Sequence, residues 1–177
     1  IELTHACVAD QVGDEKETEA ILQEIVDAGA RGFGPGVAAR CLLSIRRARM
    51  GETHTARHLL EDAHEQAAGR GPPSAWDVWL WWTKANVEVA EGHWSAAWDA
   101  FGRSVDALER RKLRWHRART LLEWAEAHLA RDESGDRERA LELLREAEAE
   151  FEAMGAHGYV QRVSGRLEEL RAGSSSA

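Results

Sequence analysis

The 177-residue sequence is poor in cysteine, proline, phenylalanine and tyrosine. Its two cysteines, Cys7 and Cys41, are too few for a disulfide framework and match no zinc-binding spacing, so we expect both to be reduced packing residues. No apolar run approaches the ~18 residues that a membrane span requires. The N-terminus, residues 1–5, lacks the basic and apolar regions of a secretory signal. These absences predict a cytoplasmic chain with no membrane partner.

The sequence also has no excess of positive charge. Its formal net charge is −8, and the 23 lysines and arginines are interspersed with 31 aspartates and glutamates instead of forming a basic stripe. A nucleic-acid backbone is therefore not an expected partner of this segment. Charges mixed in this way are typical of solvated helix faces.

Signals for β-strands and for catalytic sites are missing as well. No alternating apolar run is flanked by turn residues, so no strand is predicted. The glycine-rich stretch 32–36 lacks the preceding strand and the following Lys-Ser or Lys-Thr pair of a phosphate-binding loop. Serines cluster only in the C-terminal tail, away from any histidine and aspartate that would activate them. We therefore expect no enzyme activity and no cofactor.

A repeated spacing of four residues organises most of the chain. Each copy has a glycine followed, after 5, 9 and 12 residues, by a small, a large and a small residue that share one helical face, as required where two helices cross closely. The three clear copies are Gly51, Ala56, Leu60 and Ala63; Gly92, Ala97, Phe101 and Ser104; and Gly135, Ala140, Leu144 and Ala147. A weaker fourth copy precedes them and consists of Gly13, Thr18, Leu22 and Ile25.

Helical patterns on both sides of each glycine predict an all-α chain, with the glycine ending the preceding helix. The expected helices lie at about 3–12, 15–28, 36–50, 53–68, 75–91, 94–111, 114–131, 136–154 and 157–171. They predict one helical-repeat domain over residues 1–172, with repeats at about 2–29, 35–69, 74–111 and 113–154, a cap at 156–171 and a flexible tail at 173–177. The missing initial methionine and the polar end indicate a segment of a longer protein.

The stretch from Glu91 to Phe101, with its glycine, aromatic, small residue and second aromatic, resembles the turn of the tetratricopeptide repeat. Residues 117–170 are similar to repeat regions near the C-termini of large bacterial signalling proteins, which include ATP-binding transcriptional regulators of the maltose-regulator type and some nucleotide cyclases and kinases. The resemblance implies a right-handed superhelix of about four antiparallel helix pairs with a C-terminal capping helix. It also implies a non-catalytic region that binds a protein, a peptide or a small ligand in its concave groove.

Two features depart from that family. The copies recur after 41 and 43 residues, whereas the family usually repeats after ~34. In addition, Thr53 and Arg137 stand where the family prefers an aromatic residue. We therefore expect longer helices or turns than the family usually has.

Four of the eight tryptophans fall within residues 76–82. About two-thirds of the helix expected at 75–91 is apolar, which indicates a helix covered on several sides. The resemblance implies that Trp79, Trp82 and Asn86 face the groove. We further predict that Trp76 is a packing residue and that Trp82 is the more accessible of the two. Two alternatives stay open: the tryptophans fill the core of a long repeat, or their apolar surface is the interface of a homodimer.

The histidines raise the question of a metal site. His54, His58, Glu61 and Glu65 share one helical face and have side chains that bind zinc. Because this face points away from the buried positions of the repeat, we expect a solvated charged face and no metal. His128 lies in an apolar stripe, where we expect a satisfied, neutral core histidine.

Overall fold

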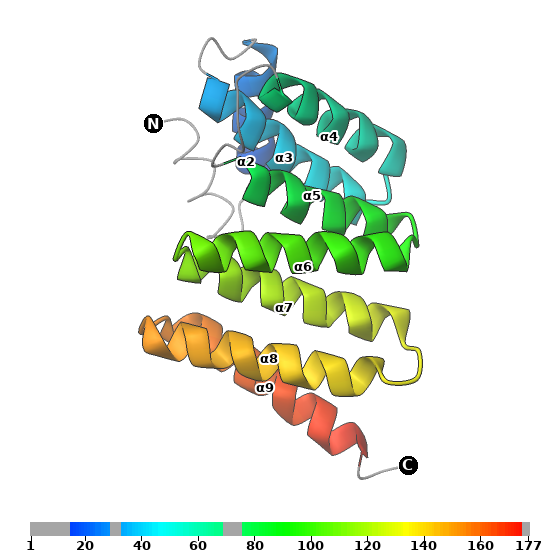
Figure 1. The fold of residues 1–177 in the computed structure, drawn as a ribbon, viewed down its shortest axis with the longest axis vertical. Helices are drawn as coiled ribbons and strands as arrows, with labels where there is room; N and C mark the ends of the chain where they lie inside the picture. Colours follow the sequence, from blue (N-terminus) through cyan, green and yellow to red (C-terminus); the bar gives the residue numbers. More distant parts are fainter. Residues whose placement is uncertain (1–14, 29–32, 69–75, 175–177) are drawn as a thin grey trace. The chain divides into compact units, whose positions relative to one another are not determined.

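The computed structural model describes residues 15–28, 33–68 and 76–174 (Figure 1). These residues form eight helices and no strand, so the all-α prediction is confirmed for them. The helices are α2 (Glu15–Asp27), α3 (Phe33–Arg49), α4 (Thr53–Ala68), α5 (Asp77–Ala90), α6 (Trp94–Arg110), α7 (Arg114–Arg131), α8 (Asp136–Ala153) and α9 (His157–Ser174). The helix expected at 3–12, Cys7, Gly13 and the last three residues of the expected tail lie outside the described residues.

The chain divides into two compact units, residues 1–100 and 101–177, and each is described by itself. In the first unit α3 packs against α2, α4 and α5, and α4 also contacts α5. In the second unit α8 packs against both α7 and α9. Short turns join α3 to α4 and α7 to α8, so that each of these helix pairs is antiparallel (Figure 1).

The predicted register of the repeat is confirmed by burial. Every small and large position of the three clear copies is at most 2% exposed, and the weaker copy in α2 follows the same rule with at most 4%. The buried positions are Thr18, Leu22, Ile25, Ala56, Leu60, Ala63, Ala97, Phe101, Ser104, Ala140, Leu144 and Ala147. The same face is therefore buried in α2, α4, α6 and α8. Small residues on either side of a large one allow the backbones of neighbouring helices to approach closely at this face.

Two of the register glycines end the preceding helix as expected. Gly51 (φ +79°) and Gly92 (φ +74°) take the left-handed conformation after α3 and α5. In each turn the glycine N–H donates to a carbonyl three residues earlier, and the next N–H donates to a carbonyl five residues earlier. This hydrogen-bond pattern satisfies the last carbonyls of the helix, and glycine takes its left-handed position at no steric cost.

The third register glycine differs from this prediction. Helix α7 ends at Arg131, and Asp132 follows it in the left-handed conformation with φ +54°. Gly135, with φ +88°, instead directly precedes α8. The prediction is wrong here because the connection spans residues 132–135, one residue more than the connections at 50–52 and 91–93. The glycine thus lies at the start of α8, not at the end of α7.

Each unit has its own apolar core. In the first unit, buried residues of α3 and α4 meet Leu80 and Val87 of α5, and Trp76 and Trp79 pack against them. Cys41 belongs to this core, and its burial raises the pKa of the thiol to about 12, which matches the predicted packing role. In the second unit, buried residues of α7, α8 and α9 surround Phe151.

Candidate functional site

The three residues predicted to face a groove lie together on α5. The rings of Trp79 and Trp82 meet edge to face with their centroids 5.6 Å apart. The Asn86 amide donates a 3.0 Å hydrogen bond to the Trp82 carbonyl, one turn earlier on the same helix. Trp79 and Asn86 are half-buried. Their binding role stays a prediction.

The accessibility of the tryptophans differs from the prediction. Trp82 is only 8% exposed, whereas Trp76 and Trp79 are half-buried, so the expectation that Trp82 is more accessible than Trp76 is wrong. The physical reason is the wide apolar arc of α5, which is covered by neighbouring helices on more than one side. Trp79 is therefore the better candidate for an aromatic residue that contacts a partner.

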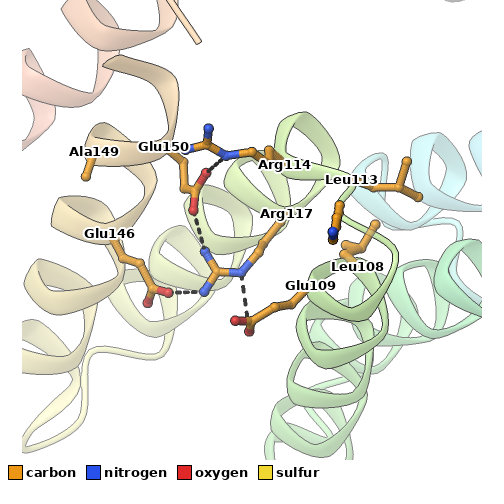
Figure 2. Close-up of a pocket in the computed structure, with 9 residues that line it drawn as sticks. Leu108, Glu109, Leu113, Arg114, Arg117, Glu146, Ala149 and Glu150 are labelled. Atoms are coloured by element: carbon orange, nitrogen blue, oxygen red, sulfur yellow. Dashed lines mark hydrogen bonds and ion pairs between the residues drawn. The ribbon is translucent and has the colours of Figure 1, made fainter. Parts of the chain in front are cut away.

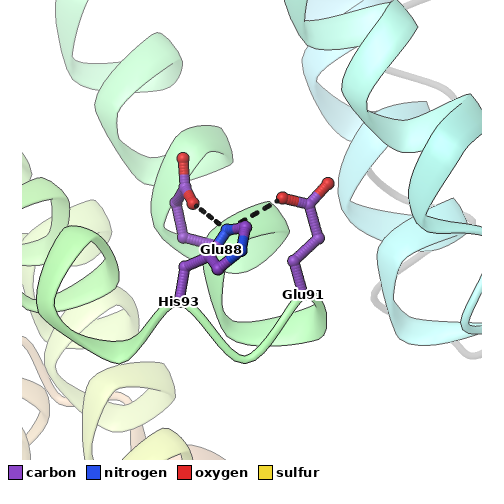
Figure 3. A group of neighbouring side chains, drawn as sticks. All are labelled: Glu88, Glu91 and His93. Atoms are coloured by element: carbon purple, nitrogen blue, oxygen red, sulfur yellow. Dashed lines mark hydrogen bonds and ion pairs between the residues drawn. The ribbon is translucent and has the colours of Figure 1, made fainter.

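A charged cluster joins α4 to the end of α5 and the turn after it, and Figure 3 shows three of its members, Glu88, Glu91 and His93. Arg57 of α4 pairs with Glu91 and, at 3.1 Å, with Glu88. His93 Nδ1 lies 3.0 Å from Glu88 Oε2 and 3.2 Å from Glu91 Oε2. Burial of Glu88 favours a raised pKa, but hydrogen bonds from Arg57 and His93 outweigh it and hold the pKa of Glu88 below its usual value. The pair with Glu91 raises the pKa of Arg57, so that this guanidinium stays charged.

Among the described residues, one group of side chains could hold a metal ion by distance alone. It consists of Glu88, Glu91 and His93, whose ligand atoms all lie within 4.8 Å of one another. Arg57 already engages both carboxylates, so a cation at this position would compete with a guanidinium. The arrangement is explained by ion pairs that hold the end of α5 against α4.

The histidine face that the sequence singled out is solvated, as predicted. His54, His58, Glu61 and Glu65 are all exposed, and they form no such compact group within the described residues. On this face, His58 Nδ1 approaches Asp62 at 3.4 Å. Nothing in this arrangement gathers the ligands that zinc requires.

A buried polar group at the start of α8 was not predicted. The carboxylate of Asp136 accepts hydrogen bonds from Arg131 at 2.7 and 2.8 Å and from the Glu133 N–H at 2.9 Å. His128 Nδ1 lies 2.6 Å from the same carboxylate, so the predicted satisfied core histidine is confirmed, with an acidic partner that the sequence did not indicate. The Arg131 guanidinium holds the pKa of Asp136 well below its usual range.

The second unit contains a cleft of about 440 Å³ (Figure 2). Its walls come from the end of α6, the turn at 111–113, the first turn of α7 and the last turns of α8. The lining residues are Leu108, Glu109, Lys112, Leu113, Arg114, Arg117, Glu146, Ala149 and Glu150. The cleft therefore combines three basic, three acidic and three apolar side chains.

Arginine and glutamate side chains organise this cleft. Glu150 accepts hydrogen bonds from Arg114 Nε at 2.8 Å and from Arg117 Nη1 at 3.2 Å (Figure 2). Arg117 also pairs with Glu146 and is only 13% exposed. Its Nε is buried without a hydrogen-bond partner, because the nearest carboxylate, Glu109, lies 3.8 Å away. The two paired glutamates lie one helical turn apart on α8, a spacing visible in the sequence, but the sequence did not show what they face.

Known proteins offer no further guide to this site. Comparisons with protein-family models, with curated proteins and with solved structures find no match for this chain. None of the helices in the described ranges has the length and apolar content that a membrane crossing demands. The function is therefore argued from the residues themselves.

Proposed function

We propose that the chain is a non-catalytic helical-repeat region of a larger bacterial regulatory protein, and that it binds a protein, a peptide or a small ligand. In this proposal the helices form a tetratricopeptide-like superhelix that acts in the cytoplasm, and its concave groove receives the partner. The observation that carries the proposal is the buried register, which repeats the same small, large and small positions in α2, α4, α6 and α8. Arrays of such repeats provide extended surfaces for partners.

The proposed contact residues are Trp79, Trp82 and Asn86 on α5. Trp79 retains exposed surface beside the buried Trp82, and large aromatic side chains supply much of the binding free energy at protein interfaces. Asn86 adds an amide one turn further along the helix. Trp79 would present an apolar surface and Asn86 one polar group that orients the partner, while the buried Trp82 would pack against Trp79 from behind.

The test begins with peptides selected on the whole chain from a random displayed library. Replacing Trp79 by alanine should weaken the selected peptides by roughly 2 kcal/mol, or about thirtyfold, because an aromatic contact residue is lost. Trp98→Ala is the matched control, since Trp98 is another half-buried tryptophan of the first unit but lies on α6. Circular dichroism would check that both variants remain folded. Peptides that bind Trp79→Ala as tightly as the original chain would count against the groove.

Self-association is a second candidate, favoured by the exposed parts of several tryptophans. Five tryptophans of the first unit are only half-buried, namely Trp76, Trp79, Trp81, Trp94 and Trp98. A stable homodimer would bury more than ~1,000 Å² in total, and this apolar surface would supply the centre of such an interface. Sedimentation velocity over a hundredfold range of concentration tests this candidate, because a dimer predicts a rising sedimentation coefficient.

A further inference from the structure

The turn between α6 and α7 places a lysine where comparable turns have glycine. Lys112 is left-handed with φ +57°; its N–H donates to the Glu109 carbonyl, and the Leu113 N–H donates to the Leu108 carbonyl. The turns at Gly51 and Gly92 have this same hydrogen-bond pattern. The left-handed conformation is sterically unfavourable for most residues that carry a Cβ, and glycine is preferred there. The lysine at this position of the cleft is therefore locally unfavourable.

The next residue also departs from local preference. Leu113 is the N-cap of α7, where an oxygen-bearing side chain usually accepts a backbone hydrogen bond, and no side-chain cap is present. Its side chain is 39% exposed, which makes it one of the two exposed large apolar residues in the described part of the chain. An apolar side chain therefore faces solvent at the cleft, directly after Lys112 in the chain.

Several hydrogen-bond donors of the cleft are left without an acceptor. Within the described residues no carboxylate pairs with the Lys112 ammonium, and the single pairing of Arg114 uses its Nε, which leaves both of its Nη groups. The buried Nε of Arg117 adds a third donor without a hydrogen-bond partner. Glu146 and Glu150, in contrast, already accept hydrogen bonds from the arginines.

We propose that this cleft binds an acidic peptide segment in which a glutamate or aspartate adjoins an apolar residue. The carboxylate of the segment accepts hydrogen bonds from Lys112 and Arg114, close to the Arg117 guanidinium, while the apolar residue covers Leu113. The volume of about 440 Å³ lies within the range of roughly 300–1,000 Å³ that is usual for ligand sites. An extended peptide suits these groups because they are close together in the chain, from the turn at 111–113 into the first turn of α7.

Glu109 gives the proposal a specific signature. It lines the cleft, its side chain is 68% exposed, and its carboxylate lies 3.8 Å from Nε of the Arg117 guanidinium, close to which the incoming carboxylate would lie. It therefore competes with an acidic peptide for Arg117, and repels it. Removing its charge should strengthen the binding of an acidic peptide, whereas it would weaken the binding of a basic one.

This site is separate from the groove proposed above. Its lining residues all belong to the second unit, whereas Trp79, Trp82 and Asn86 belong to the first. Loss of binding at one site therefore leaves the other testable, because the two sets of variants share no residue.

The experiment titrates the whole chain, labelled with nitrogen-15, with acetylated and amidated hexapeptides that carry a central Leu-Glu pair. Each peptide has a counterpart in which glutamine replaces the glutamate, and sodium butyrate serves as a carboxylate without a peptide. The expected result is a shift of the Arg117 Nε–H resonance with Leu-Glu peptides and none with their Leu-Gln counterparts. Three results overturn the proposal. Either no peptide shifts this resonance, or both members of each pair shift it equally, or butyrate binds as tightly as the peptides.

Variants then assign the binding to the cleft. Arg114→Gln and Lys112→Gly should each weaken the Leu-Glu peptides by roughly tenfold, because each removes one charged hydrogen bond. Arg145→Gln is the matched control, because Arg145 is exposed on α8 and lies outside the cleft, and it should leave the affinity unchanged. Glu109→Gln should tighten binding at least twofold. Because glycine suits the position of Lys112, weaker binding by Lys112→Gly cannot be explained by unfolding. Unchanged affinity in Arg114→Gln, or an equal loss in Arg145→Gln, overturns the assignment.

Discussion

The carboxylate of Asp136 lies 2.6 Å from Nδ1 of His128, and both side chains are buried, at 2% and 7% exposure. Asp136 is the first residue of α8 and His128 lies in the last turn of α7, so this contact joins the two helices across their connection. Arg131 and the Glu133 N–H complete the hydrogen bonds of the carboxylate. A buried charge that is fully paired in this way stabilises one arrangement of the turn.

Replacement of Asp136 by asparagine should therefore destabilise the second unit. The variant keeps the shape of the side chain but removes the charge that accepts from Arg131 and His128, at a cost of about 2 kcal/mol or more. Urea unfolding at neutral pH measures this cost. Asp132→Asn is the control, since Asp132 is exposed and asparagine also tolerates its left-handed conformation. Similar stabilities for the two variants would contradict the buried role of Asp136.

The same carboxylate predicts how stability depends on pH. Its pKa is held below the ordinary value of 3.8 in the folded state, so its contribution is fully present above that value and is lost as the pH falls further. The free energy of unfolding of the original chain should fall more steeply below about pH 4 than that of Asp136→Asn. Unfolding curves from pH 7 to pH 2.5 test this, and parallel pH profiles would contradict it.

The repeat register makes a prediction about its small residues. Ala56, Ala97 and Ala140 are 0% exposed, so leucine at any of them should overpack a helix crossing and cost about 1–3 kcal/mol. Thermal unfolding would show a lower midpoint for each variant. Ala130→Leu is the control, because Ala130 is exposed on α7 and should tolerate leucine. Tolerance of leucine at two of the three buried sites would show that the register is not a crossing point.

Most helix bounds could be predicted because their signals are local. Glycine spacing and apolar periodicity lie along the chain itself, and the bounds of α4, α7 and α8 agree with the prediction within one residue. Helix α3 begins at Phe33, three residues before the expected start, because Pro35 is compatible with the first turn of a helix. Its fixed φ and missing N–H cost nothing there.

The cleft could not be predicted, because it depends on residues that are distant in the sequence. Arg117 and Glu150 are 33 positions apart, and neither spacing nor periodicity indicates that their side chains meet. The left-handed conformation of Lys112 could not be predicted either, since local preference favours glycine there. The pairing of Arg57 with Glu88, across 31 positions, was invisible for the same reason.

Arg57 gives a prediction for the charged cluster of the first unit. Arg57→Gln would leave Glu88, which is 6% exposed, without its main cation, so the free energy of unfolding should fall by about 1–3 kcal/mol. Arg49→Gln, at an exposed position near the end of α3, is the control. Because Arg57 lowers the pKa of Glu88, its loss should raise that pKa and reduce the dependence of stability on pH in the acidic range. Carbon-13 NMR of the Glu88 carboxyl measures the pKa, and an unchanged value would contradict the pairing.

Lys112 allows stability and binding to be separated. Lys112→Gly should raise the free energy of unfolding by roughly 1 kcal/mol, because the left-handed conformation strains a lysine but not a glycine. The reciprocal change Gly92→Lys, at the matching position after α5, should lower it by a similar amount. Chemical denaturation of both variants checks the pair. A destabilised Lys112→Gly would mean that the lysine side chain stabilises the turn, and a binding role would then not be needed to explain it.

The last prediction concerns the tryptophans of α5 and distinguishes packing from binding. Trp82 is 8% exposed, so Trp82→Ala should leave a cavity and cost about 3–5 kcal/mol. Trp79 is half-buried, so Trp79→Ala should cost less stability, while the proposed groove predicts that it loses more affinity for selected peptides. Urea unfolding and peptide titration of both variants separate the two effects. If Trp79→Ala lost as much stability as Trp82→Ala and lost no peptide affinity, both tryptophans would be core residues. Their role would then be to fill the space between helices, because a repeat of 41 to 43 residues needs large side chains there.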